Sequence, residues 1–275
     1  MIIPKALLKL MIFNMGKTTT LLNKLSQKHI WDEEPVYCIT TDIDWASEDV
    51  LNLFFNEIEK YQFNLDIFTT HNSKVIDQRT QSSRYTLYPH PNFCENSSHG
   101  GNKQEVIDFI TNFVPNAKGV RMHRYGTEGM IEYELKDKYN YNFISNVVEF
   151  LSPNIKPSIS PSGMVSFPIF FEDGIYLKQK MDLDFSKNKH WFKTKGLKII
   201  NFHPIDFVLN SPSHDYMRKV RDSVSREEYN NLTLDTINEL KNKKRGIHDF
   251  VVDILDFIKQ NDYITLSLNQ LYNSI

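Results

Sequence analysis

The sequence has few cysteines, no large excess of either charge and no long hydrophobic run. Its two cysteines, Cys38 and Cys94, imply no disulfide framework, so a reducing compartment is acceptable. The formal net charge of −2 gives no reason to expect binding to nucleic acid or to an anionic membrane. The apolar stretch 2–11 is too short to span a bilayer, and no small-x-small cleavage site follows it. We therefore expect a cytoplasmic protein without a transmembrane segment.

Glycine is scarce in the first part of the chain, where Gly16 is the only glycine before Gly100. The segment Gly16-Lys17-Thr18 is similar to the end of a phosphate-binding loop. Such a loop needs another glycine five residues earlier, because backbone amides must wrap the phosphates, and Met11 stands at that position. Threonines also cap helices, and leucines at helical spacing follow. We interpret the segment as a helix start and expect no nucleotide site.

The 275 residues are 40% hydrophobic and 24% charged, which is typical of a soluble globular protein with one large domain or two small ones. Apolar runs indicate strands, and segments with apolar residues at helical spacing indicate helices. The expected strands are 36–39, 63–70, 85–88, 119–121, 164–171 and 197–202, and the clearest helices are 50–61, 105–114 and 246–259. This alternation predicts an α/β fold whose parallel strands close into a barrel or nearly so.

The most informative stretch is Thr40-Thr41-Asp42-Ile43-Asp44, which puts two carboxylates directly after an apolar strand. Asp42 and Asp44 are two residues apart, so they lie on the same side of an extended chain. One carboxylate can bind a cation while the other takes a proton from water. The alternative is structural, with Asp44 or Ser47 capping the helix that begins after them.

Polar residues also follow the other predicted strands. They are His71, His90, Arg121, the pair Glu172 and Asp173, and His203. One aspartate with two histidines is a common ligand set for zinc, and it leaves a position open for water and substrate. A further histidine can protonate a leaving amine, and an arginine can hold a carboxylate base through a bidentate pair. Any one of these histidines alone is more commonly structural, but their position at successive strand ends favours a shared metal site.

In this order and spacing, the motifs resemble those of the polysaccharide deacetylase superfamily (NodB homology, carbohydrate esterase family four), most closely its WbmS-like branch. The resemblance runs from about Cys38 to Tyr272 and implies a distorted (β/α) barrel of the NodB type in a single domain. The stretch 40–45 is similar to the first motif of the family, which makes Asp42 the catalytic base and Asp44 a metal ligand. The segment 88–93 is similar to the second, which makes His90 a ligand.

The chain departs from the family where many members have a second histidine, because Cys94 stands there. We expect His71 to be the third metal ligand, with Cys94 and His99 as alternatives.

Three further motifs complete the resemblance. The segment 119–121 is similar to the third and gives Arg121 the role of supporting the base. The segment 167–173 matches the fourth loosely, with Glu172 or Asp173 pairing with Arg121. The segment 201–204 is similar to the fifth and makes His203 the general acid.

The resemblance therefore implies a metal-dependent hydrolase, with zinc as the expected cofactor, that removes an N-acetyl or related acyl group from an amino sugar in bacterial surface-polysaccharide biosynthesis. The expected partner is a carbohydrate substrate. Two alternatives remain: a degenerate barrel that binds glycan or a biosynthetic partner, and a hydrolase of a non-sugar amide. We expect residues 1–30 to be a helical extension and 31–275 to form the barrel domain, with a polar excursion over 210–245.

Overall fold

The computed structural model describes residues 18–126 and 129–275. The glycine-lysine segment and most of the expected N-terminal extension therefore lie outside the described residues, while residues 18–25 are helical. Within the described part of the chain, no helix combines the length and the apolar character needed to cross a membrane.

The larger sheet has five parallel strands, in the spatial order β3-β2-β1-β9-β8. Their bounds are β1 Pro35–Asp42, β2 Leu65–Thr69, β3 Tyr85–Pro89, β8 Ile169–Glu172 and β9 Gly196–Phe202. Because all five run in one direction, their carboxyl ends share one edge of the sheet. Ligand and catalytic sites of parallel α/β sheets lie at this edge.

A smaller, four-stranded sheet has the order β4-β5-β7-β6, with only β6 antiparallel to its neighbour. Its strands are β4 Gly119–Val120, β5 Phe143–Ile144, β6 Ser158–Ile159 and β7 Val165–Ser166. Backbone hydrogen bonds join the two sheets. The Arg121 amide donates to the Pro89 carbonyl (3.4 Å), and the Ile169 amide donates to the Val147 carbonyl (2.8 Å). The predicted fold class is confirmed: a parallel-sheet α/β fold, consistent with a distorted barrel that no continuous ladder closes.

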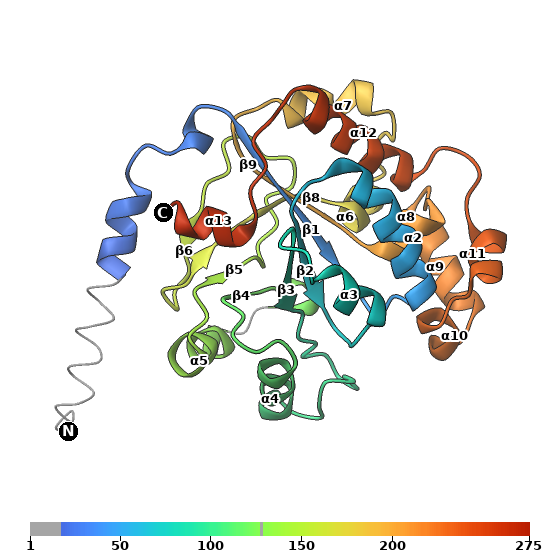
Figure 1. Ribbon diagram of the computed structural model, residues 1–275, viewed down its shortest axis with the longest axis horizontal. Helices are drawn as coiled ribbons and strands as arrows, with labels where there is room; N and C mark the ends of the chain where they lie inside the picture. The colour runs from blue at the N-terminus through green and yellow to red at the C-terminus, as the bar shows by residue number, and fades with distance from the viewer. Residues whose placement is uncertain (1–17, 127–128) are drawn as a thin grey trace.

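Helices cover the sheets on the outside. The described helices after residue 25 are η1 Ile30–Asp32, α2 Glu48–Ile58, η2 Glu59–Tyr61, α3 Lys74–Arg79, α4 Lys103–Phe113, η3 His123–Tyr125, α5 Gly129–Tyr139, α6 Asp173–Lys178, α7 Phe185–Phe192, α8 Pro204–Leu209, α9 His214–Ser223, α10 Arg226–Asn230, α11 Leu234–Leu240, α12 Ile247–Gln260 and α13 Leu268–Asn273. Figure 1 shows α2, α8 and α12 grouped beside the larger sheet, with α4 and α5 near the smaller one. The three clearest predicted helices correspond to α2, α4 and α12.

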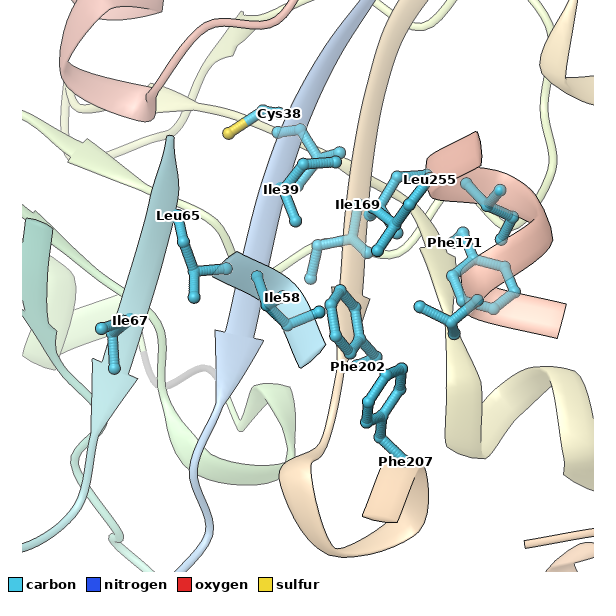
Figure 2. Packing of buried hydrophobic residues seen from close by; sticks show 14 of the residues in the cluster. Cys38, Ile39, Ile58, Leu65, Ile67, Ile169, Phe171, Phe202, Phe207 and Leu255 are labelled. Carbon is cyan, nitrogen blue, oxygen red and sulfur yellow. The ribbon is translucent and has the colours of Figure 1, made fainter. Parts of the chain in front are cut away.

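The core lies between the larger sheet and these helices. Strands β1 and β9 are buried along their whole length, as expected for central parallel strands covered on both faces. Figure 2 shows Ile58 and Leu255 from helices beside Ile39 and Phe202 from the strands. Apart from Asp66 and Lys198, the polar side chains of β1, β2 and β9 lie toward the carboxyl ends of these strands.

The predicted polar excursion is folded into α9, α10 and α11 and packs onto the domain. The Ser47 hydroxyl, which also caps α2, donates to the Leu232 carbonyl (2.6 Å), and the Leu234 amide donates to the Asp49 carboxylate (3.1 Å). Leu232 and Ile237 are buried. These contacts hold the segment over the N-terminal end of α2, which follows the carboxyl end of β1.

Lys198 is an exception in the core, since it is fully buried in the central strand β9. Its Nζ donates to the Thr194 hydroxyl (2.7 Å) and lies 4.0 Å from the centre of the Phe170 ring. No carboxylate pairs with it among the described residues. Burial lowers the pKa of Lys198 to about 8.

Lys198→Met is expected to stabilise the protein by about 1 kcal/mol at pH 7, because it removes a buried charge and keeps the volume. The melting temperature should rise by about 2–4 °C. Between pH 8 and 10.5, Lys198 is still protonated in the unfolded chain but has lost its proton in the folded chain. The free energy of unfolding of the wild type therefore rises as pH rises through that window. The gain should therefore shrink between pH 8 and 10.5. Calorimetry at pH 7 and 10, with exposed Lys195→Met as control, tests this; an equal gain at both values contradicts it.

Candidate metal centre and active site

The turn after β1 brings Asp44 back over the edge of the sheet. Asp44 and Trp45 have φ values of +39° and +58°, two successive left-handed residues that are not glycine. This conformation is unfavourable for such residues and persists where surrounding contacts hold it. The Trp45 amide donates to the Thr70 hydroxyl (3.1 Å), and the Ala46 amide donates to the Ile43 carbonyl (2.8 Å). Since Ser47 caps α2, Asp44 is not needed as a cap.

Asp44, His90 and His123 form one cluster. The Oδ1 atom of Asp44 lies 3.3 Å from His90 Nε2 and 3.1 Å from His123 Nδ1. One ligand atom from each residue lies within 4.8 Å of the other two. Burial by itself would raise the pKa of Asp44, but its hydrogen bonds with His123 and His90 lower that pKa well below its usual value.

The donor set of this cluster fits a divalent metal ion. His90 Nδ1 lies 2.8 Å from the Arg121 carbonyl oxygen, which can only accept. His90 Nδ1 is therefore the donor to this carbonyl, which leaves Nε2, on the side of Asp44, as the atom that would bind an ion. A backbone carbonyl that fixes the tautomer in this way is the usual support of a metal-binding histidine. One carboxylate and two imidazoles match a catalytic zinc site with an open position.

The structure does not bring His71 into this cluster. Its Nε2 is 3.1 Å from the Ala46 carbonyl oxygen and its Nδ1 is 3.0 Å from the Thr70 hydroxyl, so both ring nitrogens are occupied. Burial lowers the pKa of His71, which favours the neutral ring that these bonds need. The expectation that His71 supplies the third ligand is therefore corrected: His123, and not His71, stands beside Asp44 and His90, and His71 supports the turn that carries Asp44.

The two alternatives to His71 also lie elsewhere. His99 Nδ1 accepts from the Asn92 amide (3.1 Å), its Nε2 lies 2.8 Å from the Thr70 carbonyl, and its ring stacks on Phe109. Cys94 is outside the metal cluster, on the wall of a neighbouring cavity. Sequence reasoning missed His123, although the sequence carried a signal for it. Like Asp44 after Asp42, it stands two residues beyond a polar residue at a strand end.

Asp42 is buried beside this cluster and is held as a carboxylate. Arg121 Nη1 donates to its Oδ1 (2.7 Å), and Asn201 Nδ2 donates to its Oδ2 (2.9 Å). Burial tends to raise the pKa of Asp42, but Arg121, and after it His90, lower it below the usual value. An ionised carboxylate 3.9 Å from His90 Nε2 can accept a proton from water bound between them.

Arg121 is fully buried, and every nitrogen of its guanidinium group donates a hydrogen bond. Besides Asp42, its acceptors are the Thr40 hydroxyl, the Asn201 side-chain carbonyl, and the carbonyl and hydroxyl of Ser145. Sequence reasoning missed these partners. Thr40 and Asn201 are paired residues of β1 and β9, so the strand register alone places them together.

His203 is held by Asp173. Its Nδ1 lies 2.7 Å from Asp173 Oδ1, and its backbone amide donates to Oδ2 (2.8 Å). The expected pairing of Glu172 or Asp173 with Arg121 is therefore wrong, because Asp173 faces the histidine and Glu172 accepts from the amide of Ile175. Burial alone would lower the pKa of His203, yet the nearby carboxylates, above all Asp173, raise it well above its ordinary value.

These groups line a cavity of about 350 Å³. His203 Nε2 lies 3.7 Å from Asp44 Oδ2, so the histidine also reaches the metal cluster. Met217, Arg221 and Tyr229 form another wall. They come from the segment 210–245, so part of this segment lines the active-site cavity.

Three comparisons place the chain among known proteins. The model of a family described as WbmS-like polysaccharide deacetylase matches residues 39–221. The crystal structure of WbmS from Bordetella bronchiseptica, described as a polysaccharide deacetylase involved in O-antigen biosynthesis, superposes with a TM-score of 0.70. That match has 24% sequence identity and covers 80% of this chain and 90% of the other.

A peptidoglycan N-acetylglucosamine deacetylase also aligns, over 85% of this chain and 90% of its own, at 8% identity and a TM-score of 0.42. A likeness at that score adds nothing to the fold assignment. No curated protein matches the sequence.

Proposed function

This chain belongs to the WbmS-like polysaccharide deacetylase family and is a deacetylase, an amide hydrolase; we propose that it is metal-dependent and removes N-acetyl groups from an amino sugar used in a bacterial surface polysaccharide. Asp44, His90 and His123 would hold the ion. Zinc is the metal that this donor set favours. Such an ion would polarise the amide carbonyl and make a water molecule easier to deprotonate.

Two ion pairs flanking the metal cluster supply the proton transfers. Asp42, kept ionised by Arg121, takes a proton from the attacking water. His203, kept protonated by Asp173, gives its Nε2 proton to the departing amine nitrogen. The new bond joins the water oxygen to the acyl carbon, and the bond that breaks joins that carbon to nitrogen, which yields acetate and a free amine. The observation that carries the proposal is that a base and an acid, each held by its own ion pair, both reach one donor cluster.

The proposal is tested by acetate release from N-acetylated hexosamines by zinc-loaded protein, compared with chelator-treated and zinc-reconstituted samples. We expect activity that chelation abolishes and zinc restores. Non-sugar acetamides in the same panel should react poorly. Protein that binds the sugars but releases no acetate with a filled metal site would favour the glycan-binding alternative. That alternative rested on Cys94, and it weakens because His123 completes the donor set without it.

Asp173→Asn is expected to move the alkaline loss of activity to lower pH. His203 is a proton donor only while protonated, so activity falls as pH rises through its pKa. The Asp173 carboxylate raises that pKa, and asparagine removes the charge, so the fall begins earlier. At a given alkaline pH, the activity of the variant should be about tenfold below that of wild type for each unit by which the pKa of His203 falls. Profiles of kcat/KM against pH measure this, and superimposable alkaline limbs would contradict the role of Asp173.

A further inference from the structure

A second cavity, of about 290 Å³, adjoins the active-site cavity. The two share part of their lining, namely Asp44, His123, Arg124, Arg221 and Tyr229. The second cavity therefore opens directly beside the metal cluster. Each volume is near the lower limit for small-molecule sites, so together they suit a substrate with two parts.

The second cavity is lined by three arginines: Arg124, Arg221 and Arg226. The whole chain has only eight arginines, so three in one small lining is a strong concentration. Arg79, Arg121 and Arg245 each form an ion pair with a carboxylate. Among the described residues, the three cavity arginines form no ion pair or hydrogen bond, although Asp44 and Glu95 also line the cavity. Asp44 is already engaged by two histidines, which leaves an excess of positive charge.

Arg124 is held at its position against an unfavourable backbone conformation. Arg124 and Tyr125 have φ values of +58° and +55°, both left-handed. They are fixed on both sides, since His123 contacts Asp44 and the Tyr125 hydroxyl accepts from Asn201 Nδ2 (3.1 Å). A strained segment that is held next to reacting groups points to a role for the residue that it presents.

We propose that these three arginines, which we call the arginine cluster, bind a diphosphate attached to the amino sugar. The inference rests on the proposed function, because the acetamide must sit at the metal cluster while the anion lies in the second cavity. A carboxylate needs only one guanidinium for a bidentate pair, whereas a diphosphate offers oxygens and charge for several. The substrate is thus an N-acetylated amino sugar still joined to a nucleoside diphosphate or a lipid diphosphate carrier.

The test compares kcat/KM for a free N-acetylhexosamine, the same sugar as its nucleoside diphosphate, and the same sugar as a short-chain prenyl diphosphate. Zinc-loaded wild type should prefer at least one diphosphate form by roughly a hundredfold, and the preferred form identifies the carrier. Arg221→Gln and Arg226→Gln should each lower that value roughly tenfold, mainly through KM, because each removes a charge-assisted hydrogen bond. Arg226 lines the second cavity and not the active-site cavity, so Arg226→Gln should leave hydrolysis of the free sugar unchanged.

Arg218→Gln is the matched control, because Arg218 is an exposed arginine of α9 that lines neither cavity. It should behave as wild type with all three substrates. The inference fails if the free sugar is as good a substrate as the diphosphates. It also fails if Arg226→Gln lowers kcat/KM for all three substrates equally, or if neither arginine variant lowers kcat/KM for the diphosphates more than Arg218→Gln does.

Calorimetric titration of the same zinc-loaded proteins with uridine diphosphate separates this inference from the proposed function. Any contact between the diphosphate and zinc is common to all variants, so a difference between them reports the arginine cluster. If no sugar is deacetylated but wild type binds uridine diphosphate more tightly than Arg221→Gln and Arg226→Gln, the proposed function fails and anion binding stands. If the free sugar is deacetylated and binding is equal in all variants, the inference fails and the proposed function stands.

Discussion

Asp42→Asn is expected to lower kcat/KM for amide hydrolysis by about 10³-fold, within the range that a positioned general base contributes. Asparagine has the shape of aspartate but cannot take a proton from water. It keeps an oxygen where Asp42 Oδ1 accepts from Arg121, so the guanidinium loses a charge partner but not its hydrogen bond. The remaining activity should lose the acid limb that titration of a carboxylate base produces.

Asp66→Asn is the matched control for this variant. Asp66 is another buried aspartate, on β2, where it accepts from the Leu268 amide (2.6 Å), outside the active-site cavity. It should keep nearly full activity. Metal content and melting temperature must be measured for both variants, because a buried arginine without a charged partner can destabilise the fold. A folded, zinc-loaded Asp42→Asn protein with more than about a tenth of wild-type activity would contradict the assignment of Asp42 as base.

His123→Ala is expected to lower zinc affinity by at least about a hundredfold, since even residues that only support a ligand typically contribute 10–100-fold. The same loss is expected for His90→Ala. His71→Ala should keep stoichiometric zinc, because both ring nitrogens of His71 bond to the protein and not to the cluster. Elemental analysis and competition with a chromophoric chelator measure these differences.

This comparison decides between His71, which the sequence led us to expect as a ligand, and His123, which the structure places beside Asp44 and His90. If His71→Ala loses zinc and His123→Ala retains it, the ligand set drawn from the structure is wrong and the first expectation returns. His71→Ala should instead show a modest loss of stability, because the bond to Ala46 that supports the turn is gone.

Much of the site follows from the sequence because parallel strands deliver their carboxyl ends to one edge. Asp42, His90 and His203 end or directly follow apolar-rich segments that form the strands β1, β3 and β9, and Arg121 follows the short strand β4. The helices α2, α4 and α12 were predictable for the same reason, since their apolar residues recur at helical spacing. The short helices α3, α6 and α7 lack a long repeat, and packing on the domain decides them.

Three features needed the tertiary structure: which histidine completes the donor cluster, which carboxylate holds His203, and what covers the active site. His71 and His123 both follow strands, but the direction of an imidazole depends on the partners of its two nitrogens, and those partners come from distant segments. Likewise, the arginine cluster joins η3 to α9 and α10, which lie about a hundred residues apart in the sequence. Periodicity reports local burial, whereas a site depends on distances between segments, and only the folded chain fixes those distances.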